Sequence, residues 1–490
     1  MIYPDIKEFC RLGFNSKMVQ ISLEMEGDTE TPISLFKKLC GLRDSYLLES
    51  VENGTKWGRY SYIGRKPFMK IVCHGQKAVI IRGDEVTSTQ GKALDIVKRC
   101  IDDLRMATVD EMTDFNGGAV GYIGYDIIRD YEKLGKMNED DLEIPDVYLI
   151  FTEEVIVYDH MKQKIIVILN MAVSENLEEN YQAGKERLYG IRDEISKGKI
   201  DLNDEREDFA QEASYQSTET RKSFMAKVEK AKEYIKNGDI FQVVLSQRLQ
   251  IQTKIHPLDT YRSLRSINPS PYMYYFDLGD YHVVGSSPEL LVKVRAGRVE
   301  TCPIAGTRPR GKDESEDEAL AKELLMDEKE LAEHLMLVDL ARNDIGKVSQ
   351  FGTVLVNQFM DIQRYSHVMH IVSNVIGELK ADCNMYDGLT ACMPAGTVSG
   401  APKVRAMEII DELEDKKRGL YAGAVGYFGF NGNMDMCIAI RTILFKENMA
   451  YIQVGAGIVA DSEPEKEYEE TLRKAEGLVE TIRRAKERLK

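Results

Sequence analysis

In both halves of the chain, strand-like runs follow one another directly, and helical patterns stand apart from them. The first half has strand-like runs at 46–50, 68–73, 77–81, 117–123, 155–158 and 164–169, with helices predicted over 33–39 and 91–104. The second half has strand-like runs at 241–249, 272–278, 281–286, 290–295, 422–430, 434–444 and 449–454, with helices predicted over 220–236, over 316–339 and from 464 onward. Strands that neighbour strands favour a large α+β architecture with sheets packed in the core over a doubly wound parallel sheet.

An acidic run, DLNDEREDFAQE at 201–212, separates the two halves. Such a polar, charged stretch is typical of a solvated linker or exposed loop. We therefore expect an N-terminal portion over 1–205 and a C-terminal portion over 215–490, closely packed against each other.

Charge and hydropathy exclude several classes of function. The 490 residues carry a formal net charge of −16, which argues against binding to nucleic acid or to anionic membranes. No apolar run approaches the roughly 18 residues of a membrane helix, and the N-terminus has no secretory pattern. The eight cysteines are scattered without a CxxC motif, as expected for free thiols in a reducing cytoplasm.

Two pairs of glutamates have a spacing that brings them onto one helix face. Glu330 and Glu333 are three apart in one predicted helix, and Glu467 and Glu470 repeat the spacing in the C-terminal helix. Four carboxylates on two helices suit one Mg²⁺ with water and a substrate carboxylate. Two solvated acidic faces are the alternative, because this spacing is common.

Glycine-rich segments occur at 396–403 (GTVSGAPK), leading into a helix, and at 455–457 (GAG). The first is not a Walker A loop, and no GxGxxG joins a strand to a helix, which disfavours a dinucleotide fold. The second follows a strand and suits a nest of backbone N–H groups for an anion. Tight turns are the alternative for both segments.

One histidine pair and two cations complete the candidates from residue chemistry. His367 and His370 lack the further ligands of a zinc site, so they serve either in packing or as a general base. Arg441 and Lys474 suit pairing with substrate carboxylates, although each also suits a structural ion pair. Together these features indicate a site for a small polyanion with Mg²⁺, without defining the reaction.

Taken in order, the segments of the C-terminal half resemble the chorismate-utilising enzymes, most closely the large subunits of anthranilate synthases. The resemblance rests on DIFQVVLSQR (239–248), SSPELL (286–291), PIAGTRPRG (303–311), ELAEHLMLVDLARNDIG (330–346), RYSHVMHIVSNV (364–375), GTVSGAPKVRAMEII (396–410), YAGAVGY (421–427), IAIRT (438–442) and VGAGIVADSEPEKEYEET (454–471). The N-terminal half matches more loosely, through LLES (47–50), RYSYIG (59–64) and GGAVGYIGYD (117–126). The resemblance implies an aminodeoxychorismate synthase-like fold with antiparallel sheets inside and helices outside.

The resemblance also implies roles for individual residues. Glu289 matches the general acid that protonates the departing C4 hydroxyl, and His370 matches the base that removes the C2 proton. Mg²⁺ would be held by Glu330, Glu333, Glu467 and Glu470. The positions that match chorismate-binding residues are Gly306, Thr307, Tyr421, Arg441, Gly455, Ala456, Gly457 and Lys474.

Two positions distinguish relatives within the family. Gln242 stands where water-using isochorismate and salicylate synthases have a lysine, so the resemblance implies ammonia as the nucleophile. Ala305 stands where a branch of aminodeoxychorismate synthases has a lysine, which implies amination at C2 and release of anthranilate and pyruvate. The chain has no G-x-C-x-G loop, so we expect a separate glutamine amidotransferase subunit to supply the ammonia.

A feedback site for L-tryptophan is implied by LLES and by NPSPYM at 268–273. The matching residues are Glu49, Ser50, Asn268, Pro271, Tyr272 and Met273. A proline-rigid loop with an aromatic ring and a thioether can form the wall of an indole site. The alternatives to an anthranilate-forming enzyme are an aminodeoxychorismate synthase of folate synthesis and a non-catalytic protein that senses tryptophan.

Overall fold

The computed structural model describes residues 2–41, 43–52, 56–107, 113–199, 215–365 and 368–488. The acidic run at 201–212 lies outside the described residues, so the division at 205–215 stays a prediction.

The N-terminal portion contains these elements: β1 (Ile2–Tyr3), α1 (Ile6–Gly13), β2 (Met18–Glu26), α2 (Pro32–Leu39), β3 (Ser45–Glu49), β4 (Val51–Glu52), β5 (Lys56–Trp57), β6 (Tyr60–His74), β7 (Lys77–Arg82), β8 (Glu85–Gln90), α3 (Ala93–Leu104), β9 (Met106–Ala107), β10 (Gly118–Ile123), the 3₁₀ helix η1 (Tyr125–Asp130), β11 (Val147–Asp159), β12 (Lys164–Ala172) and α4 (Leu177–Lys197).

The C-terminal portion contains these elements: β13 (Tyr215–Ser217), α5 (Arg221–Lys236), β14 (Gln242–Gln252), α6 (Pro257–Ile267), β15 (Tyr272–Asp277), β16 (Tyr281–Ser287), β17 (Leu290–Arg295), β18 (Arg298–Thr301), β19 (Ile304–Pro309), α7 (Glu314–Leu324), α8 (Glu328–Val348), β20 (Leu355–Arg364), β21 (Val368–Glu378), α9 (Met385–Cys392), the 3₁₀ helix η2 (Gly396–Val398), β22 (Gly400–Ala401), α10 (Lys403–Leu413), β23 (Ala424–Gly429), β24 (Met434–Ile438), β25 (Thr442–Lys446), β26 (Met449–Ile458) and α11 (Pro464–Arg488).

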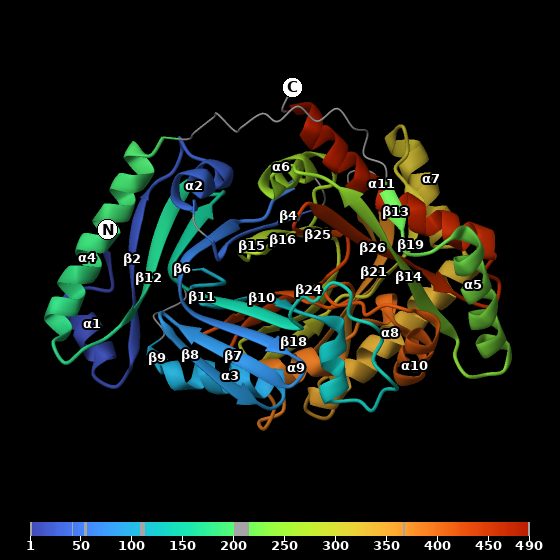
Figure 1. Cartoon of the computed structure of the whole chain (residues 1–490), viewed down its shortest axis with the longest axis horizontal. Coiled ribbons are helices and arrows are strands. Elements are labelled where there is room, and N and C mark those ends of the chain that lie inside the picture. The colour runs from blue at the N-terminus through green and yellow to red at the C-terminus, as the bar shows by residue number, and fades with distance from the viewer. Residues whose placement is uncertain are drawn as a thin grey trace.

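The strands gather in the middle of the molecule and the helices lie outside them (Figure 1). Among the described strands of the large sheet, pairing is antiparallel except for the short pair β2–β9. The predicted α+β class with antiparallel sheets in the core is thus confirmed. None of the helices in the described parts is both long and apolar enough to span a membrane.

Two strand pairs join the N-terminal and C-terminal portions by backbone hydrogen bonds: β10 pairs with β23, and β3 pairs with β15. The β10–β23 contact depends on glycine. A Cβ added at Gly118 of β10 would lie 1.9 Å from the carbonyl oxygen of Phe428 on β23. Real Cβ atoms do not approach so closely, so this glycine lets the two backbones meet.

Three segments differ from the prediction. The helix expected over 316–339 is two helices, α7 and α8, because Asp327 accepts hydrogen bonds from the backbone N–H groups of Lys329 and Glu330 and starts a new helix. The strand expected over 434–444 is interrupted between β24 and β25, where Arg441 has a φ of 49°. Helix α4, which was not predicted, ends just before the acidic run at 201–212 that we expected to be a linker.

Candidate active site

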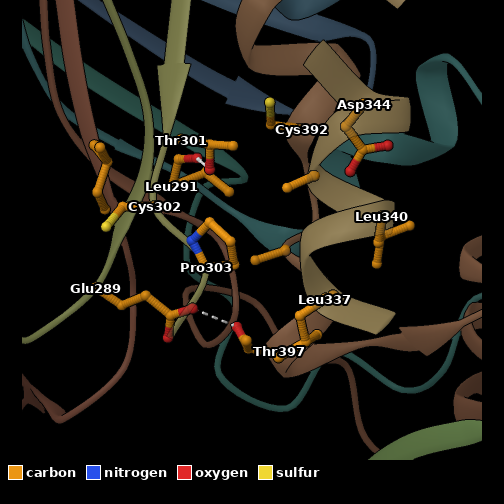
Figure 2. A pocket seen from close by; sticks show the side chains of 14 residues that line it. Glu289, Leu291, Thr301, Cys302, Pro303, Leu337, Leu340, Asp344, Cys392 and Thr397 are labelled. Atoms are coloured by element: carbon orange, nitrogen blue, oxygen red, sulfur yellow. Dashed lines mark hydrogen bonds between the residues drawn. The ribbon is translucent and has the colours of Figure 1, made fainter. Parts of the chain in front are cut away.

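Glu289 lies between β16 and β17, and its carboxylate is buried. The Thr397 hydroxyl donates a 2.8 Å hydrogen bond to its Oε1. Figure 2 shows this pair at one end of a cavity of about 40 Å³, with Asp344 and Cys392 toward the other end. Burial raises the pKa of Glu289 to about 7, against opposing effects of Thr397, Lys474 and Arg441. A carboxyl with such a pKa can hold a proton near neutral pH and act as a general acid.

Thr397 is a residue of the candidate site that the sequence did not single out. It belongs to the glycine-rich segment 396–403, which was recognised, but its partner Glu289 is 108 residues away. The predicted helix after this segment is confirmed as α10.

His370 lies on β21, opposite Thr307 of β19. Its Nδ1 is 2.9 Å from the Gly306 carbonyl oxygen and 3.1 Å from the Thr307 hydroxyl. A carbonyl only accepts, so Nδ1 carries the proton and Nε2 keeps the lone pair of a base. Burial lowers the pKa of His370, which favours the neutral form of the ring. The other predicted histidine, His367, lies outside the described residues.

Gly306, on β19, lies between His370 of β21 and helix α8. Its φ is 66°, in the left-handed region that favours glycine. A Cβ added there would lie 3.3 Å from Oε2 of Glu330. The structure therefore brings together Gly306, Thr307, His370 and Glu330.

Strands β14 and β26 form another side of the candidate site. Gly455, Ala456 and Gly457 belong to β26 and pair with β14, so the predicted turn-like nest is wrong: this segment is extended strand. Its glycines leave room for neighbours. A Cβ added at Gly455 would lie 2.6 Å from the Tyr421 hydroxyl, and one at Gly457 would lie 2.7 Å from Nε2 of Gln242. The segment therefore contacts both Tyr421 and Gln242.

Gln242 and Lys474 bring polar groups to the β14–β26 side of the candidate site. Gln242 is buried, and its Oε1 has no hydrogen-bond partner among the described residues. The Lys474 ammonium donates to the Gly455 carbonyl oxygen at 2.9 Å and lies 2.7 Å from a carboxylate oxygen of Glu470.

Arg441 occupies the break between β24 and β25 rather than the strand that was predicted. Its Nη1 donates a 3.2 Å hydrogen bond to Oδ1 of Asn268. Burial lowers the pKa of Arg441, and the nearby Glu289 opposes that effect. Arg441, with its left-handed backbone, thus places a half-buried cation near Glu289.

The four predicted metal ligands lie on α8 and α11. Burial, together with the facing carboxylates of Glu330 and Glu470, raises the pKa of Glu333. Burial and Glu470 likewise raise the pKa of Glu467, against a hydrogen bond from Ser462. Within the described ranges, no three His, Cys, Asp or Glu side chains are close enough to hold a metal ion together. Hard oxygen donors that repel one another nevertheless fit a divalent cation, which would relieve the repulsion.

A second cavity, of about 370 Å³, lies between the N-terminal and C-terminal portions. Its lining includes five of the six residues predicted to bind an inhibitor: Glu49, Ser50, Pro271, Tyr272 and Met273. The sixth, Asn268, is not part of the lining and instead binds Arg441.

Within this lining, the Glu49 carboxylate is already engaged. It accepts a 2.6 Å hydrogen bond from the Tyr261 hydroxyl and pairs with Arg265 at 2.7 Å, both on α6. The cavity is therefore joined to α6 through Glu49.

Comparison with known proteins identifies the family. The family model described as chorismate binding enzyme matches residues 46–480. Anthranilate synthase component 1 of Acetivibrio thermocellus is 51% identical over 99% of this chain and 100% of its own length. Its counterpart in Aquifex aeolicus is 46% identical over 98% of each chain.

Solved structures agree with these relatives. Anthranilate synthase component I from Streptococcus pneumoniae has a TM-score of 0.76 and 38% identity, covering 93% of this chain and 98% of that one. The menaquinone-specific isochorismate synthase of Escherichia coli has a TM-score of 0.72 at 18% identity, covering 97% and 98%, and shows the shared fold alone. The chain therefore belongs to the chorismate-binding enzyme family.

Proposed function

We propose that this chain is the synthase component of an anthranilate synthase. It would convert chorismate and ammonia to anthranilate and pyruvate, the first step of tryptophan biosynthesis. One observation carries the proposal: a buried carboxyl with a pKa near 7, Glu289, and a neutral histidine, His370, both lie near Arg441. This arrangement occurs in a chain similar over its whole length to proteins named anthranilate synthase component 1.

The first step is amination of the ring. The ammonia nitrogen bonds to C2, the ring double bonds shift, and the bond from C4 to its hydroxyl oxygen breaks. Glu289 gives its proton to that oxygen, which leaves as water, and the added nitrogen loses a proton in return. Gln242 cannot act as a base. Its unpartnered Oε1 instead suits an N–H of the incoming ammonia.

The second step makes the ring aromatic. Nε2 of His370 removes the C2 proton, and the electrons of that C–H bond enter the ring. The bond from C3 to the enolpyruvyl oxygen breaks, and pyruvate leaves after its enolate takes up a proton. The Gly306 carbonyl supports this role by holding the proton on Nδ1.

Cationic groups bind the substrate carboxylates in this proposal. Arg441 and Lys474 serve as direct partners, with Gly306, Thr307, Tyr421 and Gly455–Gly457 around the ring. Glu330, Glu333, Glu467 and Glu470 would hold Mg²⁺, which would neutralise the ring carboxylate during attack.

The supply of ammonia is assigned to a separate chain. The name component 1, which the relatives carry, implies a second component, and we propose a glutamine amidotransferase subunit for that role. All eight cysteines are free thiols, which fits the cytoplasmic location we propose. We also propose that residues 1–205 carry regulation and residues 215–490 carry catalysis.

We assign the 370 Å³ cavity to L-tryptophan as a feedback inhibitor. Its volume lies within the range of about 300–1,000 Å³ typical of small-molecule sites. Pro271, Tyr272 and Met273 offer an apolar wall for an indole ring, and Ser50 offers a hydroxyl to the amino-acid head group.

Ser50→Phe is expected to weaken inhibition by tryptophan at least about 10-fold, because the larger side chain fills the cavity. The measurement is the tryptophan concentration that halves the rate, taken relative to each variant's own uninhibited rate. Ser88→Phe, the same change on exposed β8, serves as the control. An inhibition curve identical to wild type would remove Ser50 from the inhibitor site.

The overall function is tested by incubating the full chain with chorismate, Mg²⁺ and an ammonium salt. Pyruvate and a fluorescent aromatic product are expected in equal amounts. An aminated product that still carries its enolpyruvyl group would indicate an aminodeoxychorismate synthase instead. No turnover, combined with tryptophan binding, would indicate a non-catalytic sensor.

A further inference from the structure

Arg418 is a buried cation outside the residues assigned so far, and it bonds to several segments of the site. Its guanidinium is only 1% exposed and forms a double hydrogen bond with the Glu414 carboxylate, Nε to Oε2 at 2.8 Å and Nη2 to Oε1 at 2.6 Å. Nη1 also donates to the Val398 carbonyl oxygen at 2.7 Å, and Nη2 donates to that of Val244 at 2.8 Å.

Each of these bonds leads to a different part of the candidate active site. Val398 follows Thr397, the residue that binds the Glu289 carboxylate. Val244 lies on β14, where it pairs with Gly457. The backbone N–H of Val244 in turn donates to the Ser399 carbonyl oxygen at 2.8 Å, so the two segments are also bonded to each other.

Glu414 extends the same network along β14. Its Oε1 accepts hydrogen bonds from the backbone N–H and the hydroxyl of Ser246, at 2.8 and 2.9 Å. Ser246 pairs with Gly455. The ion pair therefore holds β14 at two positions, opposite both glycines of the Gly455–Gly457 segment.

Aromatic rings bound the guanidinium as well. The Arg418 Cζ lies 4.9 Å from the ring centroid of Tyr125 and 5.5 Å from that of Tyr421. Both distances are within the range of cation–π attraction. Tyr421 is the residue whose hydroxyl meets Gly455, so Arg418 also bears on the position of that phenol.

We propose that Arg418, paired with Glu414, is a positioning residue that sets the separation between the acid side of the site, Glu289 and Thr397, and the nucleophile side, Gln242 and Gly455–Gly457. Its contacts are with Glu414, backbone carbonyls and aromatic rings, so in this proposal it acts through other residues of the site. Its planar fork bonds a carboxylate and two carbonyls at once, which the single ammonium of a lysine cannot reproduce. This inference rests on the proposed function, which assigns Glu289 as the acid and the surroundings of Gln242 as the place where ammonia enters.

The test compares Arg418→Lys with wild type, using the full chain with chorismate, Mg²⁺ and an ammonium salt. We expect kcat to fall on the order of 100-fold, because small misplacements of reacting groups cost that much, while KM for chorismate changes only a few-fold. Lys417→Met is the matched control. It removes a neighbouring buried cation, 2.6 Å from Asp146, whose contacts lie outside the site, so a loss of stability alone should leave kcat unchanged.

Glu414→Gln provides a second variant of nearly the same volume, and it decides the matter if Arg418→Lys does not fold. We expect it to lower kcat at least about 10-fold. A folded variant with wild-type kcat would overturn the proposal and leave Arg418 a stability residue only. Chorismate consumption is measured beside anthranilate formation. A wild type that consumes chorismate without forming anthranilate refutes the proposed function, yet the comparison of rates still tests Arg418.

Discussion

Glu289→Gln is expected to lower kcat by about 10²–10⁴-fold, the range in which a single general acid contributes to a rate. The glutamine keeps the shape and the contact with Thr397 but has no acidic proton for the departing C4 hydroxyl. In the wild type, the rate per concentration of free ammonia should fall as pH rises through about 7, because Glu289 loses its proton there. The residual rate of the variant should lack this alkaline decline.

The same substitution is expected to stabilise the fold at pH 8. The pKa of Glu289 rises from an ordinary value of 4.5 to about 7 on folding, so the folded state binds the proton more tightly than the unfolded state. Stability is therefore lost as pH rises from 4.5 to 7, by about 3 kcal/mol at about 1.4 kcal/mol per pH unit. A glutamine has no charge to bury, so Tm at pH 8 should exceed that of wild type.

Glu154→Gln is the matched control, since Glu154 is also a buried carboxylate. Burial raises the pKa of Glu154, but Arg65, Arg187 and Lys66 outweigh that effect and the net pKa is lowered. Its substitution should lower Tm and leave kcat unchanged. A Glu289→Gln variant with wild-type kcat would refute the assignment of the acid, and one with lowered Tm at pH 8 would refute the raised pKa.

The spacing of residues along the sequence predicted helices and strands that depend only on neighbouring positions. The glutamate pairs lie on helices α8 and α11, because spacing of three residues along a helix brings side chains to one face. Helix α4 carried a similar signal that was missed: its buried residues Tyr181, Gly184, Leu188, Ile191 and Ile195 recur every three or four positions. Its many charged residues give this segment the composition of a loop, although its apolar residues have the period of a helix.

Features that depend on one backbone conformation could not be predicted in this way. The charged amphipathic pattern continues across Leu325–Asp327, so nothing in its period marks the break between α7 and α8. The left-handed conformation of Arg441 interrupts an apolar run that reads as one strand. At Arg441 the interruption places a cation near Glu289.

The way in which residues distant in sequence come together at the site could not be predicted from local patterns. Thr397 and Glu289, and likewise Arg418 and Val244, are far apart in sequence and meet only through the packing of the sheets. The roles that the resemblance implies for the site residues, including that of Asn268 in an inhibitor site, stay predictions. In the structure Asn268 binds Arg441, which gives the NPSPYM loop a direct contact with the candidate active site.

Glu333→Gln is expected to lower the rate at limiting Mg²⁺ on the order of 100-fold. Even residues that only hydrogen-bond to metal ligands typically change metal affinity or activity by about 10–100-fold when they are substituted. Raising Mg²⁺ should restore part of the rate. Glu328→Gln, an exposed carboxylate on the same helix, is the control and should keep the wild-type dependence on Mg²⁺. Wild-type activity of Glu333→Gln at limiting Mg²⁺ would refute the proposed ligand set.

The same substitution is expected to raise thermal stability in the absence of Mg²⁺, although it lowers the rate. The pKa of Glu333 is raised by burial and by the carboxylates of Glu330 and Glu470, so this charge destabilises the metal-free fold near neutral pH. Without Mg²⁺, Glu333→Gln should therefore unfold at a higher temperature than wild type. Adding Mg²⁺ should raise the Tm of wild type, because a ligand of the folded state stabilises it, and should raise that of the variant much less. Repulsion among these carboxylates, like the buried charge of Glu289 above pH 7, thus lowers the stability of the fold at a site that the proposed chemistry requires.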